Sequence, residues 1–335
     1  MRGPVDYAPL FAELGLTADE AANVLAAAAD AHARLVALRA GLADALPPGC
    51  AAFALGSLGR YESSAASDLD LAVVYQPDRI DPAAAQQARQ RLAADLRARG
   101  YDVADKTFHS AVALGALLGD IGGRNDTNDH LTYRALLLTE GAWLCNADQA
   151  AAVVESLFGA YARGAITRGR YLTSLSNDLQ RYYRTICVDY RFKVESAGKH
   201  WAIRYFKLRH SRKLWHLANL AVFCRAALLP DDERDGWLAE QLPRPPLLRT
   251  ADALRPLGGL GLCAGLVRAY DGFLAALADP QARRALDQLG YDDREASPLF
   301  RRLRDGAERF DAAATAVVGH LWDTSRDHLV RYGML

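Results

Sequence analysis

The stretch Phe53–Tyr75, FALGSLGRYESSAASDLDLAVVY, holds two apolar runs separated by a glycine-rich turn and a polar segment. The first apolar run ends in the turn Gly56–Gly59, which has the sequence GSLG. The second run, Leu71–Tyr75, comes directly after Asp68 and Asp70. This order predicts a strand, a turn with a short helix, and a second strand that begins with two carboxylates.

The two carboxylates of this stretch point to a bound divalent cation. Side chains in a strand alternate between its two faces, so Asp68 and Asp70 are expected on one face and Leu69 on the other. Two carboxylates so close together repel each other unless a positive charge lies between them. Mg²⁺ prefers hard oxygen ligands, commonly one or two carboxylates completed by substrate phosphates and water. The pair therefore predicts a magnesium site.

The turn that precedes the carboxylates has the composition of a phosphate-binding loop. Gly56 and Gly59 lack a Cβ, so backbone N–H groups near them can approach phosphate oxygens closely. Ser57 adds a hydroxyl donor, and Arg60 adds a planar cation suited to phosphate. Glu62 either lies near the metal or, as the pattern favours, pairs with a neighbouring backbone group or with Arg60.

In these residues the sequence resembles the nucleotidyltransferases of the DNA polymerase β superfamily. Gly56-Ser57 followed by Asp68-Leu69-Asp70 is similar to their Gly-Ser…Asp-x-Asp motif. The fuller pattern, Gly-Ser-x-Gly-Arg-x-Glu…Ser-Asp-x-Asp, resembles the branch of PII-protein uridylyltransferases and DUF294-type nucleotidyltransferases. The close similarity spans about 20 residues, and order, spacing and strand context together make it specific.

The resemblance implies a third acidic residue in the next strand, which we expect over Tyr101–Phe108 (YDVADKTF). Two residues there are candidates, Asp102 and Asp105, and strand alternation places them on opposite faces. Asp102 has apolar neighbours, which favours it, whereas Asp105 precedes Lys106 in a pattern typical of a surface ion pair. Both candidates stay open from the sequence.

Composition limits the classes of function. Of the 335 residues 51% are hydrophobic, and the formal net charge is zero, with 40 basic and 40 acidic side chains. This balance argues against a general binder of long nucleic acid or of anionic membranes. Five scattered cysteines without metal-ligand spacing predict buried thiols in a reducing compartment. No apolar run is expected to span a membrane, no signal peptide is evident, and we expect a cytoplasmic protein.

The pattern of the chain predicts an α+β protein with an all-α continuation. We expect a helical lead-in over residues 1–48, a nucleotidyltransferase domain with a small mixed sheet over 49–146, and a helical domain over 147–335. In the second segment we expect a helix over 81–99 and a short helix over 111–118. After residue 147 the alternation typical of strands is absent, and helix-forming periodicity continues almost to the end.

One predicted helix of the last segment is unusually basic and aromatic. At 100° per residue, His200, Arg204, Lys207 and Ser211 fall on one stripe, and Arg209, Arg212, Lys213 and His216 fall on the opposite side. We expect Lys199, Arg204 and Lys207 to bind the nucleotide, with Lys193 as a further candidate. The alternative is that both stripes are solvated or paired with acidic residues.

The resemblance implies transfer of NMP from an NTP to a hydroxyl, with release of pyrophosphate. Asp68, Asp70 and the third acid would hold two Mg²⁺ ions, for which Mn²⁺ could substitute, while the turn and Arg60 would hold the phosphates. The acceptor is expected to be a protein or a small molecule. The alternative function is a regulatory module that binds a nucleotide with weak or no catalysis, in which no third metal ligand assembles.

Overall fold

A computed structural model gives the fold of residues 5–104, 107–162, 171–195 and 200–334. The chain divides into two compact units, each with its own internal contacts. Unit 1 comprises Met1–Val5, Ala28–Tyr171 and Leu242–Pro245. Unit 2 comprises Asp6–Ala27, Leu172–Gln241 and Pro246–Leu335.

These boundaries differ from the three consecutive segments expected from the sequence. Helix α2, Ala22–Gly41, begins in unit 2 and continues into unit 1. Its first turn is fixed in unit 2 by Asp271, whose carboxylate accepts the backbone N–H groups of Asn23 and Val24 at 2.7 and 3.0 Å. A buried carboxylate that receives two N–H donors at a helix start anchors that start firmly. Helix α2 therefore belongs to both units, and the units do not follow the order of the chain.

Unit 1 is built on a four-stranded mixed sheet in the order β3-β2-β1-β4. Strand β1 is antiparallel to both of its neighbours, whereas β2 and β3 run parallel. All six residues of β1 are buried, as expected for a central strand covered on both faces. The strands are β1 Cys50–Leu55, β2 Asp70–Tyr75, β3 Val112–Ala113 and β4 Ala142–Cys145.

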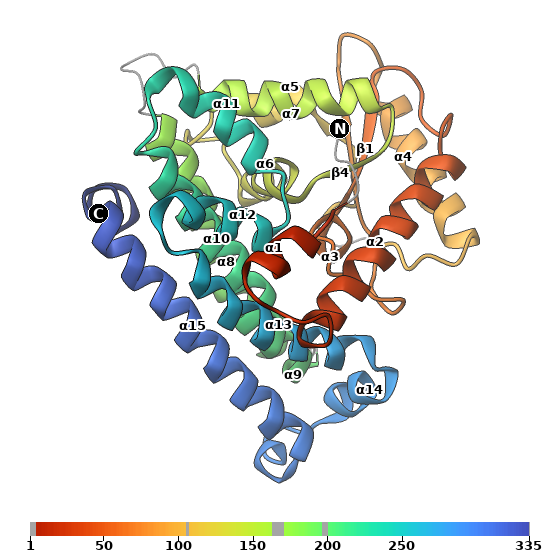
Figure 1. The fold of residues 1–335 in the computed structure, drawn as a ribbon. Helices are drawn as coiled ribbons and strands as arrows, with labels where there is room; N and C mark the ends of the chain where they lie inside the picture. Colours follow the sequence, from red (N-terminus) through yellow and green to blue (C-terminus); the bar gives the residue numbers. More distant parts are fainter. Residues whose placement is uncertain (1–4, 105–106, 163–170, 196–199, 335) are drawn as a thin grey trace. The chain divides into compact units, whose positions relative to one another are not determined.

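Helices surround this sheet and dominate the rest of the chain, which confirms the α+β prediction (Figure 1). In unit 1, α4 contacts β2, and α6 and α7 contact β1. The helices of unit 1 besides α2 are α3 Gly56–Gly59, α4 Pro82–Ala98, α5 Leu114–Leu118, α6 Asn128–Glu140 and α7 Ala147–Ala162. The helices of unit 2 are α1 Ala8–Glu13, α8 Tyr171–Glu195, α9 Trp201–Lys207, α10 Lys213–Ala226, α11 Asp231–Gln241, α12 Pro246–Leu254, α13 Cys263–Ala278, α14 Pro280–Gln288 and α15 Pro298–His328. Tyr171, the first residue of α8, still belongs to unit 1.

The strand expected over Tyr101–Phe108 is almost absent, which corrects the prediction. In the described part of that stretch, pairing with the sheet is limited to a parallel bridge between Leu69 and Val103. Side chains of α4 form hydrogen bonds with backbone groups of this stretch, and Arg89 donates to the Phe108 carbonyl at 2.6 Å. Because these groups are satisfied by side chains, they need no strand partner. The short strand β3 forms further along, within the helix expected over 111–118.

Helix α13 changes one expectation drawn from composition. Leu260–Ala278 is long and apolar enough to cross a membrane by length and composition alone, contrary to our expectation that no such run exists. Half of this stretch is buried within the protein, and it carries Asp271, which binds the start of α2. Burial and a polar anchor of this kind are typical of a core helix.

The cysteines are free thiols in the structure. Four of them are buried, which agrees with the prediction of small buried hydrophobic groups, and Cys187 is half-buried. Burial raises the pKa of Cys145 to about 11 and those of Cys224 and Cys263 to about 12. Thiols with such pKa values stay protonated and unreactive at neutral pH.

Candidate functional site

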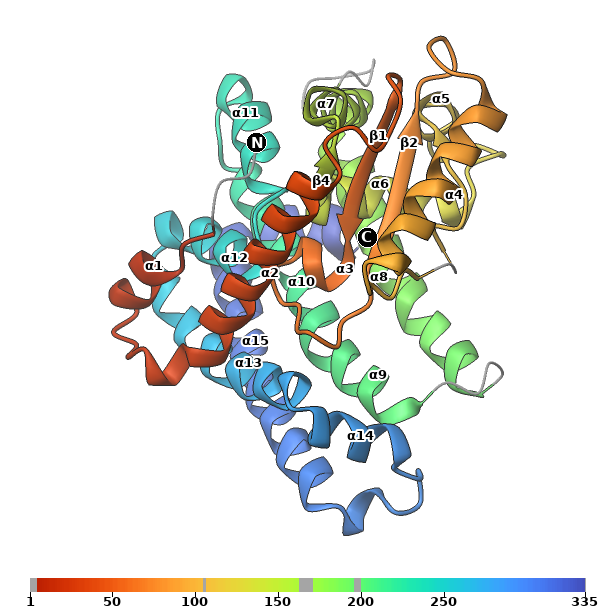
Figure 2. The same ribbon diagram turned by 90° about the vertical axis from the view of Figure 1, so that its right-hand side faces the viewer.

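The Gly-Ser turn lies where β1 ends and α3 begins (Figure 2). Strand β1 ends at Leu55 with an extended backbone, and the chain reverses at Gly56, which has a φ of 69°. This left-handed conformation is costly for residues with a Cβ and free for glycine. Ser57 is half-buried, whereas the other residues of α3 are buried. The turn therefore exposes its serine.

Asp70 lies directly against this turn. The antiparallel register of β1 and β2 pairs Leu55 with Asp70, so the first residue of β2 faces the last residue before the turn. A Cβ placed on Gly56 would collide with Oδ2 of Asp70. The distance between the two atoms would be far below 3.0 Å, the closest approach that real Cβ atoms show. Gly56 therefore serves two purposes, since it permits the left-handed turn and leaves room for the Asp70 carboxylate.

Asp68 shares the face of Asp70. Leu69, between them, is fully buried and bridges to Val103, so its two neighbours project to the opposite face of the sheet. Asp68 is exposed, and in the part of the chain that the structure describes it forms no ion pair or hydrogen bond. Asp70 is half-buried. Strand alternation through the Leu69 bridge thus places the two carboxylates on one face at an accessible edge.

The bridge at Leu69 also fixes the face of Asp102. The Leu69 N–H donates to the Asp102 carbonyl at 2.7 Å, and the Ala104 N–H donates to the Leu69 carbonyl at 3.1 Å. In this parallel register Val103 lies beside Leu69, so Asp102 projects to the same face as Asp68. Asp102 is exposed. Asp105, the other candidate, lies outside the described residues.

Arg60 is held by two carboxylates inside the domain. Its Nε donates to Glu62 at 2.6 Å and its Nη1 donates to Glu140 at 2.5 Å. Arg60 is 5% exposed and Glu140 is fully buried. Burial alone would lower the Arg60 pKa, but the charges of Glu140 and then Glu62 outweigh it and raise the pKa well above its ordinary value. The contact expected between Glu62 and Arg60 is confirmed.

This cluster gives Arg60 partners other than the phosphates that we expected. A guanidinium enclosed by carboxylates has its donors occupied and is shielded from a ligand. Glu140, at the end of α6, was not recognised in the sequence, although its second oxygen accepts the Gly56 N–H at 2.9 Å. One buried carboxylate therefore binds both the first residue of the turn and Arg60.

Gly59 has a packing function as well. A Cβ on Gly59 would overlap the backbone carbonyl oxygen of Glu140. Because that obstacle is backbone, it cannot move aside as a flexible side chain could. The absence of a side chain at Gly59 thus lets α3 pack against the end of α6, which keeps the turn and Glu140 in contact.

The loop between α3 and β2 is held by α2. Arg34 donates to the carbonyl of Ser64 at 2.9 Å and to that of Ser67 at 3.4 Å. Asp30, one turn earlier, accepts the Ser63 hydroxyl at 3.3 Å. These contacts fix the polar segment that delivers Asp68 and Asp70, so α2 supports the site as well as the core.

A comparison with family models adds independent information. The model described as "Putative nucleotidyltransferase DUF294" matches residues 8–111, about a third of the chain. Residues 8–111 match the DUF294 family. This result confirms the resemblance found in the motif between Gly56 and Asp70. No curated protein matches the sequence of this chain.

The DUF294 match includes the turn, the two carboxylates and Asp102, whereas Glu140 lies beyond it. Among the residues that the structure covers, no group of three or more histidine, cysteine, aspartate or glutamate side chains is close enough to form a metal site. The acids of residues 8–111 therefore share a face of the sheet and do not form a preformed cage.

Substituting alanine at Gly56 is expected to impair activity more than stability. The new Cβ would displace the Asp70 carboxylate, and the left-handed backbone would cost about 1–2 kcal/mol. We expect at least about a tenfold loss of nucleotidyl transfer, measured as pyrophosphate release, because misplacement by about 1 Å can cost far more.

Gly100 provides a matched control for this substitution. It also has a left-handed backbone, with a φ of 87°, but nothing lies within 4 Å of an added Cβ. Gly100→Ala should lose similar stability in thermal unfolding and retain activity. Full activity of Gly56→Ala would show that the packing of Asp70 against this glycine is unimportant.

The basic residues predicted to bind the nucleotide belong to the helical unit. Lys199 and the side chain of Lys193 lie outside the described residues, and Arg204 and Lys207 are half-buried on α9. On the opposite stripe, Arg209 and Lys213 both bind Asp311 of α15, at 2.5 and 2.6 Å.

The pairing of Arg209 and Lys213 agrees with the alternative interpretation, in which this stripe is neutralised by acidic residues. His216 of the same stripe stacks on Tyr183 with ring centroids 4.2 Å apart. Burial, followed by the charge of Arg184, lowers the pKa of His216 to about 4. A neutral stacked histidine supplies no cation for a phosphate, so this stripe has structural contacts within unit 2.

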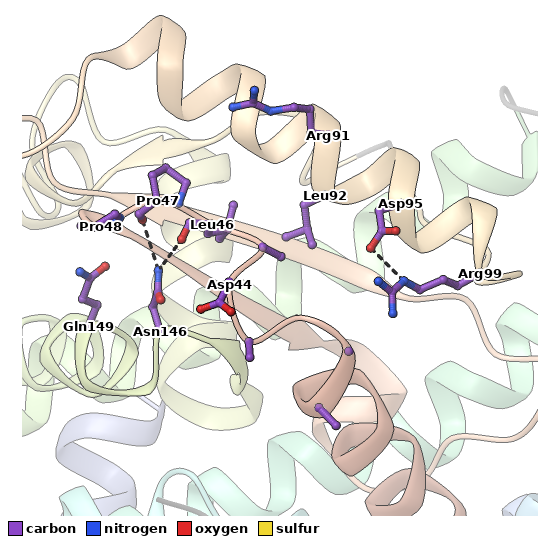
Figure 3. Close-up of a pocket in the computed structure, with 14 residues that line it drawn as sticks. Asp44, Leu46, Pro47, Pro48, Arg91, Leu92, Asp95, Arg99, Asn146 and Gln149 are labelled. Carbon is purple, nitrogen blue, oxygen red and sulfur yellow. Dashed lines mark hydrogen bonds and ion pairs between the residues drawn. The ribbon is translucent and has the colours of Figure 1, made fainter.

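A separate cavity of about 950 Å³ lies at the other end of β1 (Figure 3). Its lining includes Pro48 and Asn146, close to Cys50 at the start of the strand, whereas the predicted site follows Leu55. The Asn146 amide donates to the Leu46 and Pro47 carbonyls at 3.3 Å each, as Figure 3 shows. These polar groups fix the turn before β1, and none of the predicted site residues that the structure describes lines this cavity.

Proposed function

We propose that the chain is a magnesium-dependent nucleotidyltransferase that transfers NMP from an NTP to a hydroxyl of a protein or small molecule. The observation that supports this most directly is the packing of the Asp70 carboxylate against Gly56 of the Gly-Ser turn. Asp68 and Asp102 share the face of Asp70, and the family match covers the same residues. An accessible acidic face beside a serine turn suits metal-bound phosphates.

The residues present fit a magnesium ion. Carboxylate oxygens are hard ligands, and Mg²⁺ in phosphoryl-transfer sites is typically held by one or two of them together with substrate phosphates. Asp70 and Asp68 would supply these oxygens, with Asp102 as the further acid on that face. When bound, the metal would neutralise charge on the phosphates and lower the pKa of the acceptor hydroxyl.

The chain itself would position the reactants. The half-buried Ser57 would donate its hydroxyl to a phosphate oxygen, while Gly56 keeps Asp70 close to that oxygen. Gly59, Arg60 and Glu140 would hold the shape of the turn rather than touch the substrate. The acceptor oxygen forms a bond to the α-phosphorus as the bond from that phosphorus to the oxygen bridging to the β-phosphate breaks. The hydroxyl proton passes to solvent, and pyrophosphate leaves.

The test is incubation of the purified chain with each of the four NTPs, labelled on the α-phosphate, and Mg²⁺ in a cell lysate. We expect one lysate species to acquire the label, with an equal amount of pyrophosphate released. If no NTP gives label or pyrophosphate with Mg²⁺ or Mn²⁺, the transferase proposal fails. Tight NTP binding in the same preparation would then identify the regulatory nucleotide-binding module instead.

A further inference from the structure

Unit 2 contains a cavity of about 380 Å³ that is separate from the site of unit 1. Helices α13, α14 and α15 line it, and Figure 1 shows these three helices as neighbouring elements in blue. Its remaining wall is His210, which belongs to the π-helical turn Leu208–Arg212 between α9 and α10. Turns of this kind within α-helices are rare and frequently occur at functional sites.

Arginines and glycines repeat on the two helix faces that border the cavity. On α15, Arg302, Gly306 and Arg309 have the spacing i, i+4, i+7, which places them on one face. On α13, Arg268 and Gly272 have the same four-residue spacing, and both line the cavity. The two helix faces thus place arginines around a space that is bordered by glycines.

The glycines leave room that packing does not require. A Cβ on Gly272 would meet nothing within 4 Å, and one on Gly306 would meet only the far end of the Arg309 guanidinium, at 3.8 Å. Glycine inside a helix destabilises it relative to alanine, and here no close approach of backbone compensates. What both glycines provide is open space beside the arginines.

The charges at the cavity are unbalanced. Arg302 and Arg309 are exposed and form no ion pair or hydrogen bond within the described ranges. Among the residues that the structure describes, Arg268 bonds only through its Nε, to Glu20 at 2.7 Å, so its other nitrogens stay available there. Asp279 is the one acid among the described lining residues, and its carboxylate already accepts the Gln281 N–H at the start of α14. The cavity therefore attracts anions.

A buried hydrogen-bond acceptor completes the cavity. His210 is 1% exposed, and its Nδ1 lies 3.0 Å from the Phe206 carbonyl, which can only accept. Nδ1 therefore carries the hydrogen and Nε2 is an acceptor. The His210 ring stacks on Phe273, with ring centroids 4.5 Å apart and an angle of 2° between the ring planes. Burial lowers the pKa of His210 to about 4, so the ring is neutral at pH 7.

We propose that this cavity binds a small phosphorylated molecule that also carries a hydroxyl group. The phosphate would be held by Arg302, Arg309 and the free nitrogens of Arg268, because guanidinium groups match the geometry of phosphate. The hydroxyl would donate to Nε2 of His210. The volume suits a small molecule rather than a folded partner, and the site is independent of nucleotidyl transfer.

Isothermal titration of the full chain, without NTP or metal, tests the proposal with three probes: inorganic phosphate, glycerol 3-phosphate and glycerol. We expect glycerol 3-phosphate to bind at least about tenfold more tightly than phosphate, and glycerol not to bind. The double variant Arg302→Gln/Arg309→Gln should weaken glycerol 3-phosphate binding at least about tenfold, since two charge-assisted contacts are lost. Arg301→Gln, an exposed arginine outside the lining, should bind normally.

Two further variants keep the test decisive. Gly272→Leu should fill the cavity and abolish binding, while the exposed arginines keep their charge. His210→Phe preserves the stacked ring and should bring glycerol 3-phosphate down to the affinity of phosphate. Absence of binding by the unaltered chain, or binding that is unchanged in the double variant, would overturn the proposal. Either result leaves the transferase proposal untouched, because its readout is pyrophosphate release.

Discussion

Replacing Asp70 with asparagine is expected to abolish nucleotidyl transfer while the protein stays folded. The substitution keeps the size of the side chain, so the packing against Gly56 persists. It removes the carboxylate charge that would hold magnesium and the triphosphate. Loss of one electrostatic group at a reacting phosphate or carbonyl typically costs about 10²–10³-fold in rate, and we expect at least that loss here.

Pyrophosphate release and label transfer measure this loss, and thermal unfolding measures the fold. Asp78→Asn is the matched control. Asp78 is exposed beyond the far end of β2, and its substitution removes the same charge from the same unit. The control should retain full activity, and both variants should unfold within a few degrees of the unaltered chain. Full activity of Asp70→Asn with Mg²⁺ and NTP would remove Asp70 from the site.

The centre of the candidate site was predictable because its determinants are local. A glycine that must turn, a strand that alternates and two acids two residues apart are all contained within Gly56–Asp70. Each of these features is fixed by backbone geometry over a few residues. The register that pairs Leu55 with Asp70, by contrast, is seen in the structure alone, because the long connection over residues 56–69 does not set it. The local sequence alone therefore predicts that Asp68 and Asp70 share one face, whatever the remaining fold is.

The function of Arg60 could not be predicted, because its decisive partner is distant in the chain. Glu140 lies 80 residues away from Arg60. One feature of the sequence could have indicated it. Glu140 ends a helix directly before Gly141, where the helix dipole disfavours a carboxylate. An acidic residue in that position, inside an apolar helix, is best explained by a buried cation.

The predicted position of Ser211 on a polar stripe of the basic helix was wrong for a geometric reason. A constant 100° per residue assumes an uninterrupted α-helix, but the π-helical turn Leu208–Arg212 inserts extra backbone between α9 and α10. The phase of the helix therefore changes within the stripe. Ser211, expected beside Lys207 on a polar stripe, is buried, and its hydroxyl lies 3.2 Å from that of Tyr270. Such a change of phase leaves no simple mark in the sequence.

Substituting alanine for Glu140 is expected to destabilise unit 1 by about 3–5 kcal/mol, the largest effect on stability that we predict. The change removes the partner of the Gly56 N–H and one of the two carboxylates around Arg60. The arginine is too deeply buried for water to replace the lost charge. Because breaking a buried ion pair on one side leaves an uncompensated charge, the cost exceeds that of an ordinary hydrogen bond.

Urea unfolding gives the free-energy change, and hydrogen exchange of peptides from residues 50–75 locates it. Glu140→Gln should cost less, about 1–3 kcal/mol, because the amide still accepts the Gly56 N–H and Arg60 keeps Glu62. Glu155→Ala, an exposed glutamate of α7 in the same unit, should change stability by less than about 0.5 kcal/mol. Equal stability of the two alanine variants would show that Arg60 does not depend on Glu140, and that the turn is held by packing at Gly59.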